Sequence, residues 1–308
     1  MRSGLGFLHD HRIAVRVGVF LLLALNVVLV LAVLRRPDPT AAPSTASTEA
    51  GVLPDTSERW LVAVQPPASD ETVPNPDDAL AVRARSGTCT TGGATVERSG
   101  DGGRTWVNVT EQLRNLVLIR RVLVDDPSTA RIVGPRTDCE SDVWSSDDGG
   151  LTWTWNGDDS GIWFRRGEAN RAVHAPLGSV QGPCAARATA RDVTDDGQGN
   201  GIVLCSDGTL ARSRGEDGAT WDALGELPDA WGVSFTGETG YAVAKGADCF
   251  GAQVLSWDGA RWNPLSCVPD AGVTGAAITV RGQLGLLVGF SGTWRSVDGG
   301  VTWTPVPS

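Results

Sequence analysis

The chain has 308 residues, of which 41% are hydrophobic, and it carries a formal net charge of −10. This length supports one large domain or two small ones, and the apolar content is sufficient for a substantial core, which excludes an intrinsically disordered chain. The acidic balance argues against nucleic acids and anionic membrane faces as partners.

An apolar segment near the N-terminus predicts a single membrane-spanning helix at residues 13–34. The segment IAVRVGVFLLLALNVVLVLAVL is long enough to cross a hydrocarbon core of roughly 30 Å. A cleaved signal peptide is the alternative, but it has a shorter apolar region followed by a small-residue cleavage site, whereas RRPDPT follows here. The arginines before the apolar centre, with the free amino terminus, favour a cytoplasmic tail at residues 1–12.

The next stretch, residues 35–57, predicts a flexible linker. It is rich in Pro, Ala, Ser and Thr and has no apolar periodicity. Short apolar runs separated by turn residues begin at about residue 58. We therefore expect one folded domain at residues 58–308, presented outside the cytoplasm at the cell membrane.

An eight-residue pattern recurs within this domain. SGDGGRTW begins at Ser99, SDDGGLTW at Ser146 and SVDGGVTW at Ser296. Two weaker copies, SRGEDGATW and SWDGARW, end at Trp221 and Trp262. Consecutive final tryptophans are 41 to 68 residues apart, and periods of this size with β-rich runs between turns are typical of a radial array of four-stranded blades.

Each repeat contains four predicted strands. The runs are short, apolar and rich in β-branched residues, which favours strands over helices. The Asp and Gly residues of the eight-residue pattern suit a tight turn between the third and fourth strands. The predicted strands are 231–237, 240–246, 252–257 and 261–266 in the fourth repeat, and 274–280, 284–290, 292–297 and 302–307 in the fifth.

The pattern resembles the Asp-box, or bacterial neuraminidase, repeat of β-propellers in sialidases, sortilin-type receptors, some glycoside hydrolases and photosystem II assembly-factor-like proteins. The resemblance covers about residues 58–308 and implies that each box lies at a rim turn, away from the ligand-binding face, with a structural role. The residues assigned this role are Ser99, Asp101, Gly103, Trp106, Ser146, Asp148, Gly150, Trp153, Trp221, Asp258, Trp262, Ser296, Asp298, Gly300 and Trp303.

Five boxes predict an all-β propeller of about five four-stranded blades. The longest interval between boxes is expected to hold one blade plus an insertion near residues 158–182, with no room for a sixth blade. The sequence shows no strand exchange that would join the first blade to the last.

Three arginine pairs are candidate ligand-binding residues. If they converge at the mouth of the propeller, they could hold an acidic group. The alternative is solvated or salt-bridged surface charge. The six residues are Arg83, Arg85, Arg120, Arg121, Arg165 and Arg166.

No catalytic residue is assigned. The sialidases that share the repeat have an Arg-Ile-Pro stretch and a Tyr nucleophile, but this chain lacks the former, and its single tyrosine, Tyr241, lies in a predicted core strand. A glycoside hydrolase remains the alternative function, and two carboxylates about 5–9.5 Å apart at the central mouth would favour it.

No metal or cofactor is predicted. The histidines His9, His11 and His174 form no cluster suited to zinc. Residues 196–207 faintly resemble a calcium loop, with Asp196, Gln198, Asn200, Gly201 and Asp207 at ligand-like spacing, but a turn between the first two strands of a blade is the favoured interpretation.

All six cysteines lie beyond the predicted anchor, and an even number in an exported domain indicates disulfides. In the predicted blades Cys89, Cys139 and Cys249 follow second strands, Cys205 ends one, Cys267 follows a fourth strand and Cys184 begins a first strand. All six then lie on one face. This placement predicts the pairs Cys89–Cys139, Cys184–Cys205 and Cys249–Cys267.

The strand pattern around GYAVAKG and LSWDGARW resembles the photosystem II assembly-factor-like group, whose propellers are scaffolds. The resemblance implies the architecture. Together with the apolar segment at residues 13–34 and the lack of an assigned catalytic residue, it leads us to expect a membrane-anchored, non-catalytic propeller that binds a protein or cell-envelope ligand. It does not identify that ligand.

Overall fold

The computed structural model describes residues 58–65, 75–113, 115–136, 139–157, 159–166 and 171–307. All of them belong to the second of two units into which the chain divides, residues 52–308. The predicted cytoplasmic tail, membrane anchor and linker lie outside the described residues. Within the described part of the chain, no helix is both long and apolar enough to cross a membrane.

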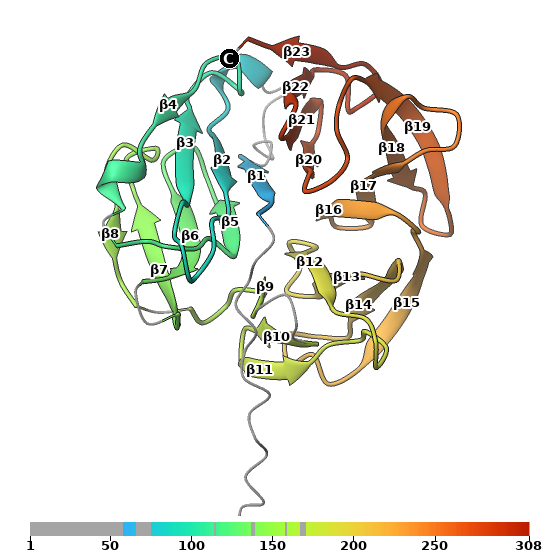
Figure 1. Ribbon diagram of the computed structural model, residues 1–308, viewed down its shortest axis with the longest axis horizontal. Coiled ribbons are helices and arrows are strands. Elements are labelled where there is room, and N and C mark those ends of the chain that lie inside the picture. The colour runs from blue at the N-terminus through green and yellow to red at the C-terminus, as the bar shows by residue number, and fades with distance from the viewer. Residues whose placement is uncertain are drawn as a thin grey trace, which may run out of the picture. The chain divides into compact units, whose positions relative to one another are not determined.

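The described residues form six antiparallel sheets arranged radially as the blades of a β-propeller (Figure 1). Blades 1 and 2 contain β1 (Trp60–Val64), β2 (Ala81–Arg85), β3 (Thr95–Ser99) and β4 (Val107–Asn108), then β5 (Arg121–Val124), β6 (Ala130–Pro135), β7 (Ser141–Ser146) and β8 (Thr154–Trp155). Blades 3 and 4 contain β9 (Phe164–Arg165), β10 (Ala172–Ala175) and β11 (Gly178–Gln181), then β12 (Ala190–Asp195), β13 (Gly201–Cys205), β14 (Thr209–Ser213) and β15 (Trp221–Glu226). Blades 5 and 6 contain β16 (Ala230–Thr236), β17 (Thr239–Lys245), β18 (Gly251–Trp257) and β19 (Trp262–Pro269), then β20 (Ala277–Arg281), β21 (Leu284–Gly289), β22 (Gly292–Ser296) and β23 (Thr304–Val306). The described residues also contain two 3-10 helices: η1 (Pro76–Asp78) lies in the β1–β2 loop, and η2 (Thr110–Gln112) follows β4 in the connection to blade 2.

The prediction of five blades is wrong, because the structure has six. Blade 3 occupies the segment expected to be an insertion, and its described residues form three strands, β9 to β11. The number of eight-residue patterns did not predict this blade, because its β10–β11 turn lacks the pattern. That turn is PL, between Ala175 and Gly178. The core of blade 3 is nevertheless that of a blade: Trp163 is buried and packs edge-on against Trp221 of blade 4, with ring centroids 5.8 Å apart.

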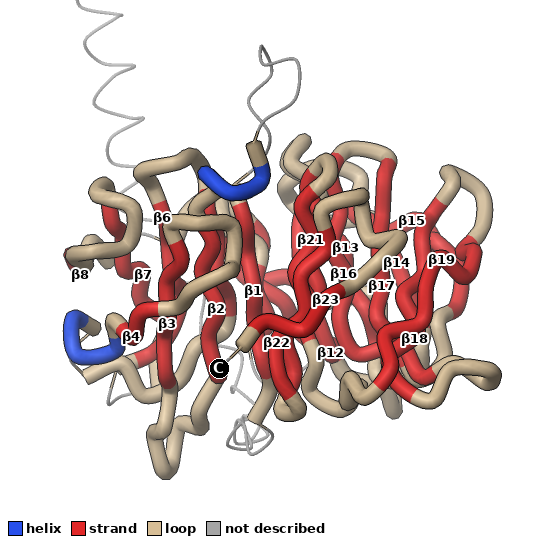
Figure 2. Tube along the Cα trace, turned by 90° about the horizontal axis from the view of Figure 1, so that it is seen from above, coloured by secondary structure: helices blue, strands red, loops and turns tan. Residues whose placement is uncertain are grey.

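The strands form where apolar residues recur between glycine-rich turns. In β13 all five residues of GIVLC are buried, and in β21 all six of LGLLVG are buried, as expected for strands with blades packed on both faces. Within each four-stranded blade the strands follow one another in sequence order (Figure 1). Figure 2 shows the ring edge-on, with the strands running between its two faces. Turns after first and third strands therefore lie on one face, and loops after second and fourth strands lie on the other.

Blades 1 and 6 close the ring by side-chain and backbone contacts, since their sheets contain only their own consecutive strands. The amide of Trp60 donates to the Gly275 carbonyl at 2.8 Å, and Arg295 Nε donates to the Gly102 carbonyl at 2.8 Å. An apolar cluster that includes Val64 and Leu286 lies between the two sheets. Non-covalent packing alone therefore joins the two ends of the described ring.

The three complete eight-residue patterns form turns with the same hydrogen bonds. In the first, Ser99 Oγ donates to Asp101 Oδ1 at 2.6 Å and accepts from the Gly103 amide at 2.8 Å. Thr105 donates to the Asp101 carboxylate from both its amide, at 2.9 Å, and its hydroxyl, at 2.6 Å. The turns beginning at Ser146 and Ser296 repeat this network.

These turns also contact the preceding blade around the ring. Gly103 has a φ of +87°, and a Cβ there would lie 2.6 Å from Leu286 of blade 6. In the last blade, Ser266 of blade 5 donates from Oγ to the Gly300 carbonyl at 2.7 Å and accepts from Trp303 Nε1 at 3.0 Å. The pattern thus fixes both a hairpin and its packing against the neighbouring blade.

Candidate functional site

Three disulfides lie on the face formed by loops after second and fourth strands, which we call the disulfide face. The bonds join Cys89 to Cys139, Cys184 to Cys205 and Cys249 to Cys267, with Cα–Cα distances of 5.9, 5.5 and 5.6 Å. These are the three predicted pairs. Two placements differ from prediction: Cys184 lies in the connection before β12, not at the start of a strand, and Cys267 lies within β19, not after it.

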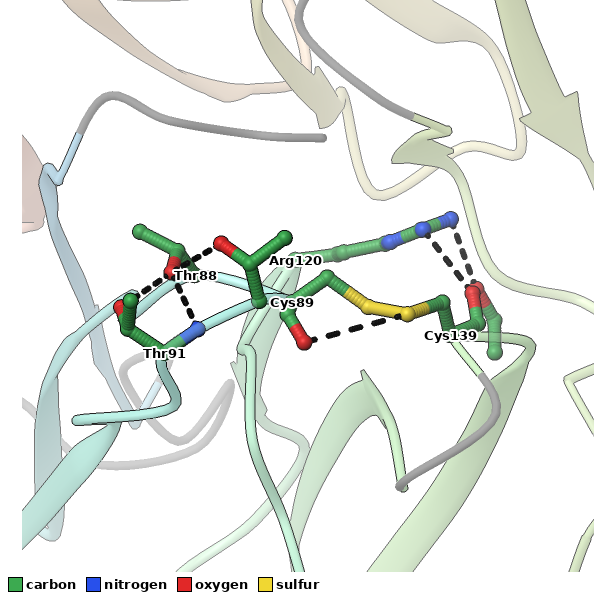
Figure 3. Close-up of a disulfide and its surroundings, with 7 residues drawn as sticks. Thr88, Cys89, Thr91, Arg120 and Cys139 are labelled. Carbon is green, nitrogen blue, oxygen red and sulfur yellow. Dashed lines mark hydrogen bonds between the residues drawn. A yellow bond between two sulfur atoms is a disulfide. The ribbon is translucent and has the colours of Figure 1, made fainter. Parts of the chain in front are cut away.

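The Cys89–Cys139 bond links the loops of two adjacent blades, 1 and 2 (Figure 3). Arg120 extends beside it, donating from Nη2 to the Cys139 carbonyl at 3.3 Å and from Nη1 to Ser141 Oγ at 2.9 Å. On the other side, Thr88 Oγ1 accepts from the Thr91 amide at 3.1 Å. Side-chain bonds therefore hold both loops close to the disulfide.

The disulfide face also presents aromatic side chains. Phe250, next to Cys249 in the β17–β18 loop, is fully exposed. Phe290, in the corresponding loop of blade 6, is half exposed and lies edge-on to Trp60, with ring centroids 6.4 Å apart. The Arg85 guanidinium lies 6.0 Å from the Phe290 ring centroid. This face combines loops fixed by disulfides with aromatic residues open to a partner.

A cavity of about 640 Å³ occupies the centre of the ring. Its walls come from the innermost strands β1, β5, β12, β16 and β20 and from the turns that follow β12 and β16. Blade 3 contributes no described residue to this lining. The cavity therefore extends toward the face that carries the eight-residue turns, which we call the turn face.

Arg59 crosses the other end of the central channel. It precedes β1 in blade 1, and its Nη1 donates to the Arg191 carbonyl at 2.8 Å and to Asp192 Oδ1 at 3.0 Å, both in blade 4. Its Nη2 donates to the Arg120 carbonyl of blade 2 at 3.2 Å. One buried guanidinium thus connects three blades where the inner strands begin.

Among the described residues, each of the four carboxylates that line the cavity contacts an arginine. Asp192 is paired with Arg59, as described above, and Asp195 Oδ2 accepts from Arg121 at 2.9 Å. The other two pairs are Asp125–Arg131, at 2.7 Å, and Asp196–Arg212, at 3.5 Å. These four carboxylates are therefore engaged in ion pairs.

The predicted ligand-binding arginines do not converge. Arg83 donates to Glu97 at 2.7 Å and to Thr293 of blade 6 at 2.5 Å, and Arg85 pairs with Glu58. Arg121 reaches from blade 2 to Asp195 of blade 4 inside the cavity.

The remaining three candidates lie elsewhere on the ring. Arg120 holds the loop of Cys139, Arg165 is buried in β9, and the exposed Arg166 donates to Ser179 at 2.6 Å. Only Arg121 lines the central cavity.

The weak calcium-loop resemblance at Asp196 is a hairpin turn in the structure, between β12 and β13. Asp196 Oδ1 accepts from the amides of Gln198, at 2.8 Å, and Asn200, at 3.1 Å, so the carboxylate caps its own turn. Among the described residues there is no cluster of three or more His, Cys, Asp or Glu side chains that could hold a metal ion.

Four charged residues at the centre of the ring were not indicated by the sequence: Arg59 at the end of the channel, and Asp192, Asp195 and Arg281 in the cavity lining. Arg59 and Arg281 stand at opposite ends of their inner strands, and ends of inner strands meet at the centre of a propeller. Once the inner strands were located, their terminal positions would have indicated Arg59 and Arg281 as residues of the central channel.

No family model matches the sequence, and the search of curated proteins also found no match. Solved structures similar to this chain include "YCF48 bound to D1 peptide", with 18% identity over 80% of this chain and 82% of that chain, and a TM-score of 0.39. A GH74 enzyme from Niastella koreensis has 15% identity over 79% of this chain and 46% of its own, with a TM-score of 0.41. The fucose-specific lectin from Aleuria aurantia has 10% identity over 80% and 94% of the two chains, with a TM-score of 0.44. No functional residue of this chain is assigned from these similarities.

Proposed function

We propose that this protein is a non-catalytic binding scaffold, tethered to the membrane, that holds a protein or cell-envelope partner on its disulfide face. The observation that carries the proposal is the position of the three disulfides, which all fix loops of this one face. Loops fixed before binding lose less conformational entropy when a partner docks, so their contacts contribute more to affinity.

The side chains exposed on this face support the proposal. Phe250 is fully exposed beside the Cys249–Cys267 bond, and Phe290, Trp60 and Arg85 form a second group on the neighbouring blades. Aromatic and arginine side chains dominate the binding energy of many protein interfaces. A rigid loop face with such residues suits recognition of a protein surface.

The proposed location is the extracytoplasmic side of the cell membrane. Disulfides form and persist in oxidising compartments, and the apolar segment at residues 13–34 would serve as the anchor, with residues 1–12 in the cytoplasm and residues 35–57 as the tether. The eight-residue turns are, in this proposal, Asp-boxes with a structural role. Their shared Ser–Asp–Thr network and their contacts to neighbouring blades support that role.

Photo-crosslinking in intact cells tests the proposal. A photoreactive phenylalanine analogue replaces Phe250 on the disulfide face, and in a matched control it replaces Leu151, which is half exposed on the turn face. We expect a crosslinked species from position 250 and none from position 151. We also expect the Cys249→Ser, Cys267→Ser double variant to reduce crosslinking from position 250, because the β17–β18 loop is no longer fixed by its disulfide. Equal crosslinking from both positions, or crosslinking from position 151 alone, would contradict the proposal.

A further inference from the structure

Among the described residues of the central cavity, one cationic side chain has no anionic partner. Arg281, the last residue of β20, lines the cavity, and its Nη1 donates to the backbone carbonyl of Phe235 in blade 5. Among the described residues no carboxylate lies within ion-pair distance of it. The four carboxylates of the cavity wall are each paired with another arginine.

The burial of Arg281 and the nearby Arg121 disfavour the charged form of its guanidinium. Burial lowers the pKa of the Arg281 guanidinium, and the positive charge of Arg121 acts in the same direction, while the Asp195 carboxylate acts in the opposite one. Asp195 is already bonded to Arg121 and to the Gly197 amide. A buried cation stays costly unless an anion accepts its hydrogen bonds.

Two hydroxyl groups are also available nearby. Thr279 precedes Arg281 by two residues on β20 and so projects to the same side of the strand. Ser234 precedes Phe235, whose carbonyl accepts from Arg281. Both Thr279 and Ser234 line the cavity, and neither side chain has a hydrogen-bond partner among the described residues. The cavity therefore combines an unpaired guanidinium with hydroxyl groups that can donate or accept.

We infer that the central cavity binds the carboxylate of a small monoanionic ligand, with Arg281 as its anchor. A guanidinium matches a carboxylate by two parallel hydrogen bonds. The charge balance selects a monoanion, because Arg281 is the single unpaired cation of the described lining and Asp195 would repel a second negative charge. The volume of about 640 Å³ is in the usual range of small-molecule sites.

This site is separate from the proposed partner surface. The cavity extends toward the turn face, whereas Arg59 crosses the channel at the end next to the disulfide face. The two proposals can therefore fail independently: loss of carboxylate binding leaves crosslinking at position 250 unchanged.

The test is a binding titration of the purified full-length chain at constant ionic strength and neutral pH. The ligands are acetate and gluconate as free monocarboxylates, a tripeptide whose only carboxylate is its C-terminus, and sulfate as the dianion. Isothermal calorimetry or ligand-observed NMR measures binding to wild type and to Arg281→Gln. The control is Arg214→Gln, which removes an exposed arginine paired with Asp222 on the outer strands of blade 4.

We expect at least one monocarboxylate to bind wild type, with affinity reduced by about tenfold or more in Arg281→Gln and unchanged in Arg214→Gln. Preference for gluconate or for the tripeptide distinguishes a free acid from a chain terminus as the source of the carboxylate. Arg281→Lys keeps the positive charge but lacks the planar guanidinium, so it should reduce the affinity for the monocarboxylate by an intermediate factor. This variant replaces Arg281→Gln in the test if the glutamine variant does not fold. Absence of monocarboxylate binding to wild type, equal binding to Arg281→Gln, or tighter binding of sulfate would overturn the inference.

Discussion

Arg59 and Asp192 belong to blades 1 and 4, which lie opposite each other in the ring of six (Figure 1), yet their side chains meet at 3.0 Å. Asp192 also accepts from the amides of Val193 and Val233 at 3.0 Å each. The Arg59 side chain is 9% exposed and that of Asp192 14% exposed, so the pair is largely shielded from water. The contact therefore ties together blades that share no sheet edge.

We predict that Arg59→Ala lowers the free energy of unfolding by about 3–5 kcal/mol, because it leaves the Asp192 carboxylate buried without its cation. It also leaves the carbonyls of Arg120 and Arg191 without this donor. Urea unfolding of the full-length chain measures the change. The matched control is Arg214→Ala, whose pair with Asp222 is exposed, and it should leave the unfolding midpoint unchanged. Equal unfolding midpoints for Arg59→Ala and wild type would contradict the prediction that the Arg59–Asp192 pair stabilises the fold.

A second prediction concerns the tryptophan that ends an eight-residue turn. Trp153 is 8% exposed, and its Nε1 donates to the Gly150 carbonyl at 3.1 Å. Trp153→Ala should lower the free energy of unfolding by about 3–5 kcal/mol through lost burial and the cavity left behind. Trp155→Ala is the control, because this residue is two positions later in β8 and 48% exposed, and it should cost under about 1 kcal/mol. Similar losses for both variants would show that burial is not the cause.

The aspartates of these turns predict a dependence of stability on acid pH. Hydrogen bonds from Thr152 lower the pKa of Asp148 to about 2. Burial alone would raise the pKa of Asp101, but hydrogen bonds from Ser99 and Thr105 lower it to about 2. Both values lie below 3.8, so the unfolded chain binds these protons first.

Their stabilising contribution is therefore complete above about pH 4 and is lost as the pH falls toward 2. Urea unfolding between pH 5 and pH 2 should show that Asp148→Asn destabilises the chain most above pH 4 and progressively less below it. A destabilisation that stays constant across this range would mean that the carboxylate charge does not matter.

The strands could be predicted from the sequence where each blade follows the repeat. In blade 5 the predicted ranges 231–237, 240–246 and 252–257 agree within a residue with β16, β17 and β18. Blade 3 could not be predicted this way, because the sequence signal was the turn pattern and blade 3 lacks it. A turn can be made by other residues, whereas apolar strands are required by the packing on both faces of a blade.

The cysteine pairs could be predicted because a disulfide depends on which loops share a face, and strand order determines that. The partners of the arginines could not be predicted. A guanidinium lies at the end of a long side chain, and its partner can come from another blade that is brought near only when the ring closes. Arg121 begins the inner strand β5, but its partner Asp195 comes from blade 4, beyond the blade that the sequence did not reveal.

The predicted anchor has its own test. If residues 13–34 span the membrane with residues 1–12 in the cytoplasm, protease added to intact spheroplasts should digest the propeller. Replacing the leucines of residues 21–34 by serine should release the domain from the membrane fraction. Complete protection of the propeller from protease in intact spheroplasts, with digestion only after lysis, would place it in the cytoplasm and overturn the topology.

The disulfides should differ in how much they stabilise the fold. A cross-link stabilises chiefly by restricting the unfolded chain, and more so for a longer loop. Cys89 and Cys139 are separated by 50 residues and Cys249 and Cys267 by 18, so the double serine variants should lose about 4 and about 3 kcal/mol respectively. Urea unfolding without reductant measures both, and peptide mapping without reduction should recover all three pairs from wild type. A different pairing would remove the basis of the disulfide face, and a larger loss from the short loop than from the long one would show that native-state contacts, not loop length, set the order.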